Sequence, residues 1–398
     1  MIGGGFSGAL TALHLATRGV RAIVLEPGAL GRGLAFADGA PGLLLNTPAG
    51  AMSALPDRPD DFVAWLGDGA TFAPRARYGA YVREKLAAVV HVRTRAVDLA
   101  PASGGYQVST SDGALCWARH VVLALGNAPP RTPPCLRGLA AYAGDPYRAM
   151  TELPTGAWPI ALLGTGLTAL DAVATLRARG HTGPILAISR RGLVPQRHPG
   201  VPDAAAIAPP TATTLAGLLA WWRTSVDTSA KLDALRPLLP ALWRGLSPHD
   251  RARFVRHVRP HWETVRHRAP PAVHDHLASV EIVAGALTDA AALAGGVRLH
   301  VGARHLDVAA IINCTGPERD LARQADPLVE HLLRRGLVHR DPLGLGASWL
   351  APNLHAVGPW RIATEWESTA VGELRVQAAE VARAISEHLG EPAPGALE

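Results

Sequence analysis

The first residues of the chain with a spacing that could do chemistry are three glycines. They are Gly3, Gly5 and Gly8, in the order G-x-G-x-x-G. In this arrangement the first glycine permits a tight turn and the second lets the backbone approach a pyrophosphate. The third lets the following helix pack closely on its strand. Phe6 and Ser7 fall at the predicted start of that helix, where exposed N–H groups attract phosphates. The spacing therefore predicts a dinucleotide site.

An acidic residue completes this first unit. Residues 20–25 are an apolar segment that predicts a strand, and Glu26 follows it, eighteen positions after Gly8. A carboxylate at this point accepts hydrogen bonds from a ribose and repels a 2′-phosphate, so the unit favours FAD or NAD. Because only Met1 and Ile2 precede the glycines, we expect the first strand of the unit to be truncated.

A second segment repeats the same arrangement. The apolar residues 160–163 predict a strand, and Gly164 and Gly166 follow it, with alanine at the third small position. A helical pattern then begins at Leu167 and Thr168. Two such units in one chain predict two nucleotide sites, with these four residues as candidate cofactor contacts.

The second unit differs from the first in the charge that follows its next strand. Residues 185–188 predict that strand, and Arg190 and Arg191 stand where the first unit has an acid. Arginine favours a 2′-phosphate, so we expect this unit to prefer NADPH. The alternative is that both arginines are solvent-exposed loop charges.

Two further apolar segments end in glycine turns. Residues 121–125 precede Gly126, and residues 310–314 precede Gly316. In flavoproteins with two dinucleotide units, the chain crosses between the units near such turns. Both glycines, together with Val97, are candidate cofactor contacts.

Composition bounds the remaining possibilities. A length of 398 residues predicts two or three domains. Cys116, Cys135 and Cys314 are sparse and form no CxxC pair, so we expect no disulfide framework and a cytoplasmic location. We find no signal peptide and no membrane-spanning run. The positive charge, which gives a net charge of +6, comes almost entirely from arginine. Outside one segment of the expected insertion, no basic run is interleaved with aromatics, so we expect no nucleic-acid partner.

Taken together, these motifs resemble the bacterial FAD/NAD(P)-binding-domain family, which is similar in layout to class B flavin monooxygenases and amino-acid N-hydroxylases. The matching stretches cover nearly the whole chain and are GGGFSG, LGRGLAF, LLLNTPAGAMS, FVAWL, YGAYV, GTGLTALD, ISRRG, RFVRHVRPHWETVRHR, NCTGP, DPLGLG and ATEWESTAVGELRVQA. The chain departs from relatives in lacking both the F-x-G-x-x-x-H-x-x-x-W fingerprint of Baeyer–Villiger monooxygenases and the cysteine pair of disulfide reductases.

The resemblance implies that residues 31–33 and 43–53 form loops lining the flavin. Arg32, Asn46 and Met52 are therefore candidate cofactor contacts. Asn46 is also a candidate catalytic residue, as a hydrogen-bond partner of the flavin or the substrate. The alternatives are a loop-forming role for Asn46, since asparagine is common in turns, and a packing role for Met52.

The C-terminal segment carries an amphipathic helical pattern over residues 371–389, with Gly390 after it and Thr369, or the serine before it, as the predicted N-cap. In flavoproteins similar to this chain, the N-terminus of that helix points at the flavin and stabilises its negative charge. Gly358, Thr369 and Ala370 are therefore candidate flavin contacts through their backbone groups. The alternative is an ordinary capped helix that packs on the core.

A helical insertion is expected over about residues 202–271, with Ser247 as an N-cap. Its second half is rich in arginine and histidine but contains no metal-binding motif. Because the resemblance covers this stretch, Arg253 and His257 are candidate catalytic residues, and Arg266 could also bind an anionic substrate or the phosphates of NADPH. The alternative is a solvated charged face.

The sequence thus predicts an α/β fold with two Rossmann-like dinucleotide-binding domains and a helical insertion. The expected FAD domain is discontinuous, covering 1–150 and 300–398, and the expected NADPH domain covers 151–299. The resulting hypothesis is an FAD-dependent oxidoreductase in which NADPH reduces the flavin and dioxygen is used to oxygenate a small molecule. Two alternatives stay open, namely a reductase that passes electrons to a quinone or protein, and a non-enzymatic flavin redox sensor.

Overall fold

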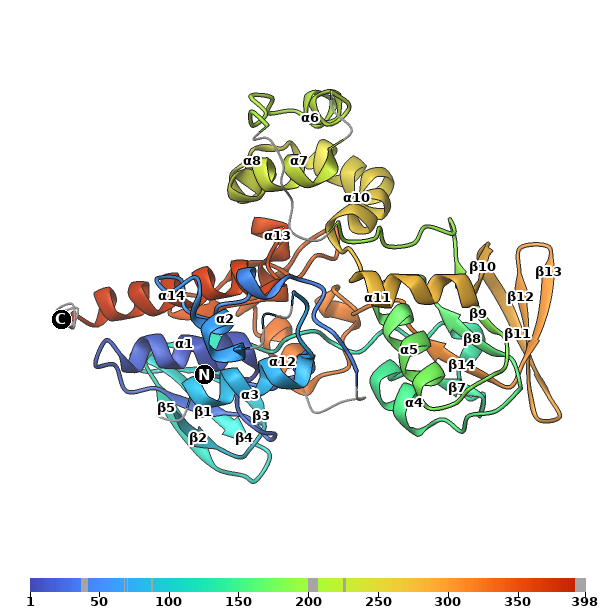
Figure 1. Ribbon diagram of the computed structural model, residues 1–398. Helices are drawn as coiled ribbons and strands as arrows, with labels where there is room; N and C mark the ends of the chain where they lie inside the picture. Colours follow the sequence, from blue (N-terminus) through green and yellow to red (C-terminus); the bar gives the residue numbers. More distant parts are fainter. Residues whose placement is uncertain are drawn as a thin grey trace.

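The computed structural model describes residues 1–36, 42–67, 69, 71–86, 89–199, 207–224 and 227–390. Its parallel strands form two sheets, drawn at the left and the right of Figure 1, and a layer of helices lies above them. This arrangement confirms the predicted α/β fold. The first residues of the expected insertion, 202–206, lie outside the described residues.

The first sheet has Met1 and Ile2 at its centre. Its strands are β1 (Ile23–Leu25), β2 (Val90–Val92), β6 (Val121–Leu123) and β17 (Leu354–Ala356). β2 pairs with β1, and β6 pairs with β17, all in parallel. Ile2 joins the two pairs through parallel bridges to Leu25 and Leu123, and its N–H donates to the Val122 carbonyl over 2.9 Å. The two residues before the glycines therefore occupy the position of the expected first strand.

The two faces of this sheet are covered by different elements. Val121 and Leu123 belong to the core formed with an antiparallel meander and α12, whereas Val122 and Ala124 pack against α1 and α14. Successive side chains of a strand point to opposite faces, so a continuous apolar strand must be covered on both. The covering elements are α1 (Phe6–Ala16), α12 (Pro327–Arg334), α14 (Val371–Leu389), β3 (Ala96–Ala102), β4 (Gly105–Thr110) and β5 (Leu115–Ala118).

The second sheet has five parallel strands in the order β10-β9-β8-β14-β7. They are β7 (Tyr142–Ala143), β8 (Ile160–Leu163), β9 (Ile185–Ser189), β10 (Glu281–Ala284) and β14 (Ala310–Asn313). Ile160 and Leu162 pack on the helical face, and Ala161 and Leu163 pack on the face covered by an antiparallel sheet. The covering elements are α4 (Pro146–Glu152), α5 (Leu167–Ala178), β11 (Leu287–Leu293), β12 (Gly296–Val301) and β13 (Arg304–Val308).

Two strands of the second sheet lie outside the range 151–299 that was expected for the second unit. β7 precedes that range, and β14 follows it and pairs directly with β8. The sheet therefore draws on residues from 142 to 313. Short apolar segments that form parallel strands look alike in a sequence. Which of them become neighbours is decided by contacts between distant segments, so the sequence does not show the limits of each sheet.

A layer of short helices, drawn at the top of Figure 1, contains the described residues of the expected insertion. Thr214 and Ser247 each cap a helix by accepting a backbone N–H three residues further on, as was predicted for Ser247. A π-helical turn at Phe254–Val258 precedes Pro260, which lies in a first helical turn, where its missing N–H costs no bond. The helices of this layer are α6 (Leu215–Trp222), α7 (Thr228–Leu235), α8 (Leu239–Gly245), α9 (Pro248–Arg253) and α10 (Arg259–Arg266). The next helix, α11 (Pro271–His274), packs on α5 beside the second sheet.

An aromatic cluster holds the segment between β1 and β2 against α1. Neighbouring rings of Phe6, Phe36, Phe62, Tyr78 and Tyr81 have centroids between 4.6 and 6.0 Å apart. Tilted and edge-on pairs at these separations are favourable beyond the area they bury. The remaining elements are α2 (Asp61–Leu66), α3 (Arg75–Lys85), α13 (Ile362–Glu365), β15 (Val338–Arg340) and β16 (Ala347–Leu350). None of the helices in the described part of the chain is both long enough and apolar enough to cross a membrane.

Three histidines meet where α14 passes the first sheet. His120 Nδ1 lies 3.1 Å from His355 Nε2, and the ring of His388 is 4.9 Å from that of His120. Burial, followed by the nearby His120, lowers the pKa of His355 to about 4. Between pH 6.5 and 4 the unfolded chain therefore binds a proton here that the folded chain does not, so folding weakens as the pH falls.

We expect His355→Gln to reduce this acid sensitivity. The free energy of unfolding of the wild-type protein should fall by up to roughly 3 kcal/mol between pH 7 and pH 4 because of this site, and that of the variant should fall by less. Urea denaturation of both proteins at pH 4.5 and 7.5 measures the difference. His249, whose side chain is 79% exposed, provides the control variant His249→Gln. Identical pH dependence in all three proteins would contradict this account.

Candidate functional site

The first glycine turn is packed too closely for other residues at two of its positions. Gly3 has a φ of +95°, and a Cβ on it would collide with the carbonyl oxygen of Ala124. A Cβ on Gly8 would collide with the carbonyl oxygen of Gly3. The turn therefore brings the start of α1 directly against the carboxyl end of the sheet, as the glycine spacing predicted.

The start of α1 has no cap from its own chain. Its N-cap is Gly5, no side chain accepts a hydrogen bond there, and its first turn contains no acidic residue. Phe6, Ser7 and Gly8, which form that turn, are buried. Buried N–H groups need an acceptor, and the start of a helix favours an anion. The pyrophosphate of a dinucleotide therefore fits this turn.

Two charged residues lie beside the turn. Glu26 accepts from the Gly4 N–H over 2.9 Å and from the Gly28 N–H over 2.8 Å, so its carboxylate lies at the turn. Arg32 is half-buried, and its neighbour Gly33 lies against Gly5. The structure thus brings both candidate residues to the first turn, and their roles toward a ribose or a flavin stay predictions.

The second glycine turn repeats this geometry. Gly164 has a φ of +105°, and a Cβ on it would collide with the carbonyl oxygen of Cys314. A Cβ on Gly3 would collide with the carbonyl oxygen of Ala124 in the same way. Gly166 is the N-cap of α5, again without a side-chain cap, and open space surrounds the position of its missing Cβ. Leu167 and Thr168 form the half-buried first turn of α5. An anion therefore fits here as well.

Arg190 and Arg191 follow β9 directly, and both side chains are exposed. β9 is the neighbour of β8, and the carboxyl ends of parallel strands lie at one edge of a sheet. The two arginines are therefore at the same edge as Gly166. This placement supports the predicted preference for a 2′-phosphate, which stays a prediction.

The N-terminus of α14 lies next to the first turn. Gly358, which follows β17 and has a φ of +83°, donates its N–H to Gln377 of α14 over 2.9 Å. A Cβ on Gly358 would lie only 3.7 Å from Ser7 Oγ. The predicted cap at Thr369 was wrong, because the N-cap is Ala370 and no side chain caps the helix. A second uncapped helix start therefore faces the same region, while Gly390 ends α14 as predicted, with a φ of +70°.

The loop at residues 43–53 packs onto both helices. Asn46 is half-buried in this loop, and Met52 is buried in the apolar cluster that contains Phe6. Arg375 of α14 donates to the carbonyl oxygen of Ser53 over 2.9 Å. Asn46 is therefore held near the two helix starts, and Met52 packs in the adjoining core. A cofactor contact of either residue stays a prediction.

The two predicted crossing turns connect the two sheets. Gly126 follows β6 of the first sheet and leads to β7 of the second, and Gly316 follows β14 and leads back toward α12. The two crossings touch where the Glu318 N–H donates to the Pro129 carbonyl over 3.3 Å. Val97 lies half-buried in β3. The structure confirms the crossings, and a cofactor contact of Gly126, Gly316 or Val97 stays a prediction.

The three candidate residues of the insertion have different surroundings. Arg253 has a side chain that is 53% exposed and is paired with Asp250 at 3.5 Å, which indicates a role within its helix. His257 is exposed and lines a cavity between helices. Arg266 is almost buried, and its Nε lies 3.1 Å from Glu367 Oε2.

Sequence reasoning missed the partner residues of Arg266. Glu367 is 7% exposed and also accepts from Trp262 Nε1 over 2.9 Å, and Glu373 of α14 lies 3.3 Å from Arg266. These contacts tie α10 to the segment that leads into α14. The positive charge of the insertion could be seen in the sequence, but its buried partners lie about one hundred residues away.

We expect Glu367→Gln to destabilise the fold strongly. It would leave Arg266 buried with only the more distant Glu373, and breaking a buried pair costs about 3 kcal/mol or more. Asp307→Asn is the control, because it breaks the Arg298–Asp307 pair, whose side chains are 47% and 52% exposed, and such pairs contribute less than about 1 kcal/mol. Thermal unfolding compares the two variants. Equal melting temperatures would contradict the assignment of Arg266 and Glu367 as a stabilising buried pair.

Comparisons with known proteins agree with this architecture. Residues 1–128 match the family model described as FAD-NAD(P)-binding, whereas a comparison with curated protein sequences finds no match. Among solved structures, the chain is similar to L-lysine 6-monooxygenase from Pseudomonas syringae (TM-score 0.69, 16% identity, 97% of this chain and 98% of that one). It is similar to ornithine hydroxylase from Pseudomonas aeruginosa (TM-score 0.66, 16% identity, 98% of both chains). It is also similar to bacillithiol disulfide reductase from Bacillus cereus (TM-score 0.55, 14% identity, 97% and 98%). The chain thus has the fold of these solved structures, and residues 1–128 resemble the FAD-NAD(P)-binding family model.

Proposed function

We propose that the protein is an FAD- and NADPH-dependent monooxygenase of a small molecule, with FAD in the first unit and NADPH in the second. The observation that carries this proposal is the repetition of one uncapped glycine turn on two sheets, with the start of α14 beside the first turn. The names of the similar L-lysine 6-monooxygenase and ornithine hydroxylase support oxygenation rather than another flavin chemistry.

The residues of the first unit would each hold one part of FAD. The N–H groups of residues 6–8 donate to its pyrophosphate, and Glu26 accepts from its adenosine ribose. The start of α14, at Thr369 and Ala370, places the positive end of a helix dipole where negative charge develops. When bound, FAD supplies the transfer of electrons from NADPH to dioxygen. Asn46 stays the candidate hydrogen-bond partner for the flavin or the substrate.

The second unit would hold NADPH in the same manner. Backbone N–H groups at Leu167 and Thr168 donate to its pyrophosphate, and Arg190 and Arg191 pair with its 2′-phosphate. An acidic residue at that point would repel the phosphate, so the contrast with Glu26 assigns the two cofactors to the two units.

The cysteines argue against a disulfide reductase, although such an enzyme shares the fold. All three are free, and they lie in different elements: Cys116 in β5, Cys135 in a helical turn at Pro134–Leu136, and Cys314 after β14. Cys314 is buried, and burial raises the pKa of its thiol. A dithiol reaction requires two cysteines within bonding reach, with one present as thiolate.

Rapid mixing tests the proposed function directly. NADPH should reduce the bound flavin without oxygen, and faster than NADH does. Oxygen should then reoxidise the flavin in two resolved spectral phases. A single phase with oxygen, together with faster reoxidation by a quinone such as menadione, would indicate a reductase. No reduction by either nucleotide would indicate a flavin sensor.

Replacing Arg190 and Arg191 with alanine should weaken NADPH selectively. Each charge-assisted contact to a phosphate contributes about 1.5–3 kcal/mol, so the Kd of NADPH should rise at least about tenfold while that of NADH changes little. Fluorescence titration of the FAD-loaded protein measures both constants. Arg304→Ala removes an exposed charge elsewhere on this unit and is the control. Equal losses for both nucleotides would show that the arginines do not contact the 2′-phosphate.

Glu26→Gln should weaken the binding of FAD and leave the binding of NADPH nearly unchanged. A charge-assisted hydrogen bond to the ribose becomes a neutral one, which should cost about 1–2 kcal/mol of FAD affinity. Flavin release on dilution is compared with NADPH titration of the fully loaded protein. Glu330→Gln, at a side chain that is 74% exposed, is the matched control. Weaker NADPH binding with unchanged FAD would mean that the two units hold the opposite cofactors.

A further inference from the structure

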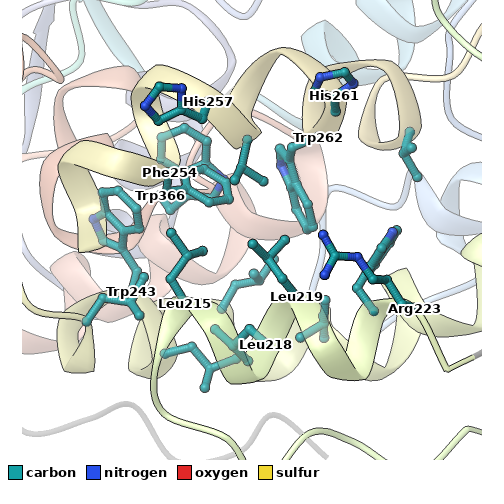
Figure 2. A pocket seen from close by; sticks show the side chains of 17 residues that line it. Leu215, Leu218, Leu219, Arg223, Trp243, Phe254, His257, His261, Trp262 and Trp366 are labelled. Atoms are coloured by element: carbon teal, nitrogen blue, oxygen red, sulfur yellow. The ribbon is translucent and has the colours of Figure 1, made fainter. Parts of the chain in front are cut away.

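A cavity of about 390 Å³ lies inside the helical layer, between α6, α8 and the helix that runs from α9 to α10. Figure 2 shows Leu215, Leu218 and Leu219 of α6 on one side, and Phe254 and Trp262 of the facing helix on the other. Its volume suits a small organic molecule, and its walls are mostly leucine and tryptophan side chains.

The aromatic wall of this cavity is tightly arranged. The ring of Trp366 lies 4.8 Å from that of Trp243 and 4.7 Å from that of Phe254. Trp366 has a φ of +63°, which is strained for a bulky residue and persists only where the surroundings hold it. Its backbone N–H donates to the Ile362 carbonyl over 2.9 Å. The wall is therefore a fixed surface rather than a gap between loose helices.

The same wall is joined to the start of α14. Trp366 is followed by Glu367, which Arg266 and Trp262 hold in place, and α14 begins at Val371. On the other side, Trp243 Nε1 donates to the Ala363 carbonyl over 2.9 Å. The cavity is thus fixed, through one short segment, to the helix start that faces the proposed flavin site.

The charges that line the cavity have one sign. No carboxylate is among the residues that line it, and its charged or titratable members are Arg223, His257 and His261. Among the described residues, no carboxylate pairs with Arg223. The nearby Glu367 and Asp250 already accept hydrogen bonds, from Trp262 and from the backbone of Leu215. An ammonium group entering here would lose its hydration without meeting a carboxylate, and the faces of the tryptophan rings would offset that loss only in part.

We propose that this cavity binds the substrate, and that the substrate is a neutral or anionic molecule with an aromatic or branched aliphatic body rather than an amino acid or diamine with a free ammonium side chain. This inference rests on the proposed function and narrows its substrate class. It separates the chain from the similar structures that are named for lysine and ornithine. The leucines and tryptophans would enclose the apolar body, and Arg223 would attract an acidic group.

Calorimetry on the FAD-loaded full chain tests the proposal with three probes. 3-Phenylpropionate and phenethylamine share a ring and differ in charge, and 1,5-diaminopentane has no ring. We expect 3-phenylpropionate to bind at one site at least tenfold more tightly than phenethylamine, and 1,5-diaminopentane to bind most weakly. Preferential binding of 1,5-diaminopentane, or no binding of either aromatic probe, would overturn the proposal.

Adding a negative charge to the cavity wall tests whether the probes bind in this cavity. Leu219→Glu places a carboxylate in the cavity and should invert the preference, so that phenethylamine binds more tightly than 3-phenylpropionate. Misfolding cannot produce such an inversion. Leu115→Glu, at a position in β5 that is 63% exposed, is the control and should keep the wild-type preference. The same preference in both variants would overturn the assignment to this cavity.

These results are distinguishable from a failure of the proposed function. If NADPH does not reduce the flavin but Leu219→Glu still inverts probe preference, the cavity assignment stands and only the oxygenase proposal fails. If NADPH reduces the flavin and lysine or ornithine is oxygenated with a kcat/KM that Leu219→Glu does not change, the cavity assignment fails and the oxygenase proposal stands.

Discussion

Gly8 lies so close to the turn before it that a single methyl group on its Cα would collide with the carbonyl oxygen of Gly3. This contact forces α1 to begin at the carboxyl edge of the sheet, directly after the glycine turn that follows Ile2. A helix that begins there buries its first N–H groups, and Gly5 offers no side chain to accept from them. The start of α1 is therefore suited to an anion, and the acid at Glu26 and the loop at Arg32 gather around it.

The N-terminus of α14 lies beside the same turn. Its start has no cap either, and it is held beside α1 by Gly358, which bonds to Gln377 and faces Ser7. Two helix dipoles thus point toward one region from a rigid pair of packed helices. Because the elements carrying these ends belong to the same core, the electrostatic arrangement exists before any ligand arrives. Such preorganisation makes fixed dipoles effective in an enzyme.

The helical layer depends on the same region in a different way. Arg266, Trp262 and Trp243 reach from the layer to the segment that precedes α14, and each makes a hydrogen bond to it. Burying Arg266 is tolerable only because Glu367 and Glu373 are both present. The layer is therefore fixed to the segment that leads into α14, next to the proposed flavin site.

Local features of this protein follow from the sequence alone. The glycine spacings predicted both turns, and short-range patterns predicted the cap at Ser247 and the end of α14 at Gly390. Each of these depends on residues within a few positions of one another, where backbone geometry and steric contact leave few options. The cap expected at Thr369 failed because the chain there is held by Trp366 and Glu367 through contacts with the insertion.

Tertiary structure alone decided the rest. β7 and β14 join the second sheet although they lie outside the expected range, because strand pairing depends on which distant segments meet. Arg266 became the buried partner of two carboxylates that come from more than one hundred residues away, and a ligand contact of Arg266 stays a prediction. The cavity with Trp366 in its wall likewise combines α6, α8, α10 and the segment before α14. A sequence shows which residues could do chemistry, but packing between distant segments determines which of them face the same space.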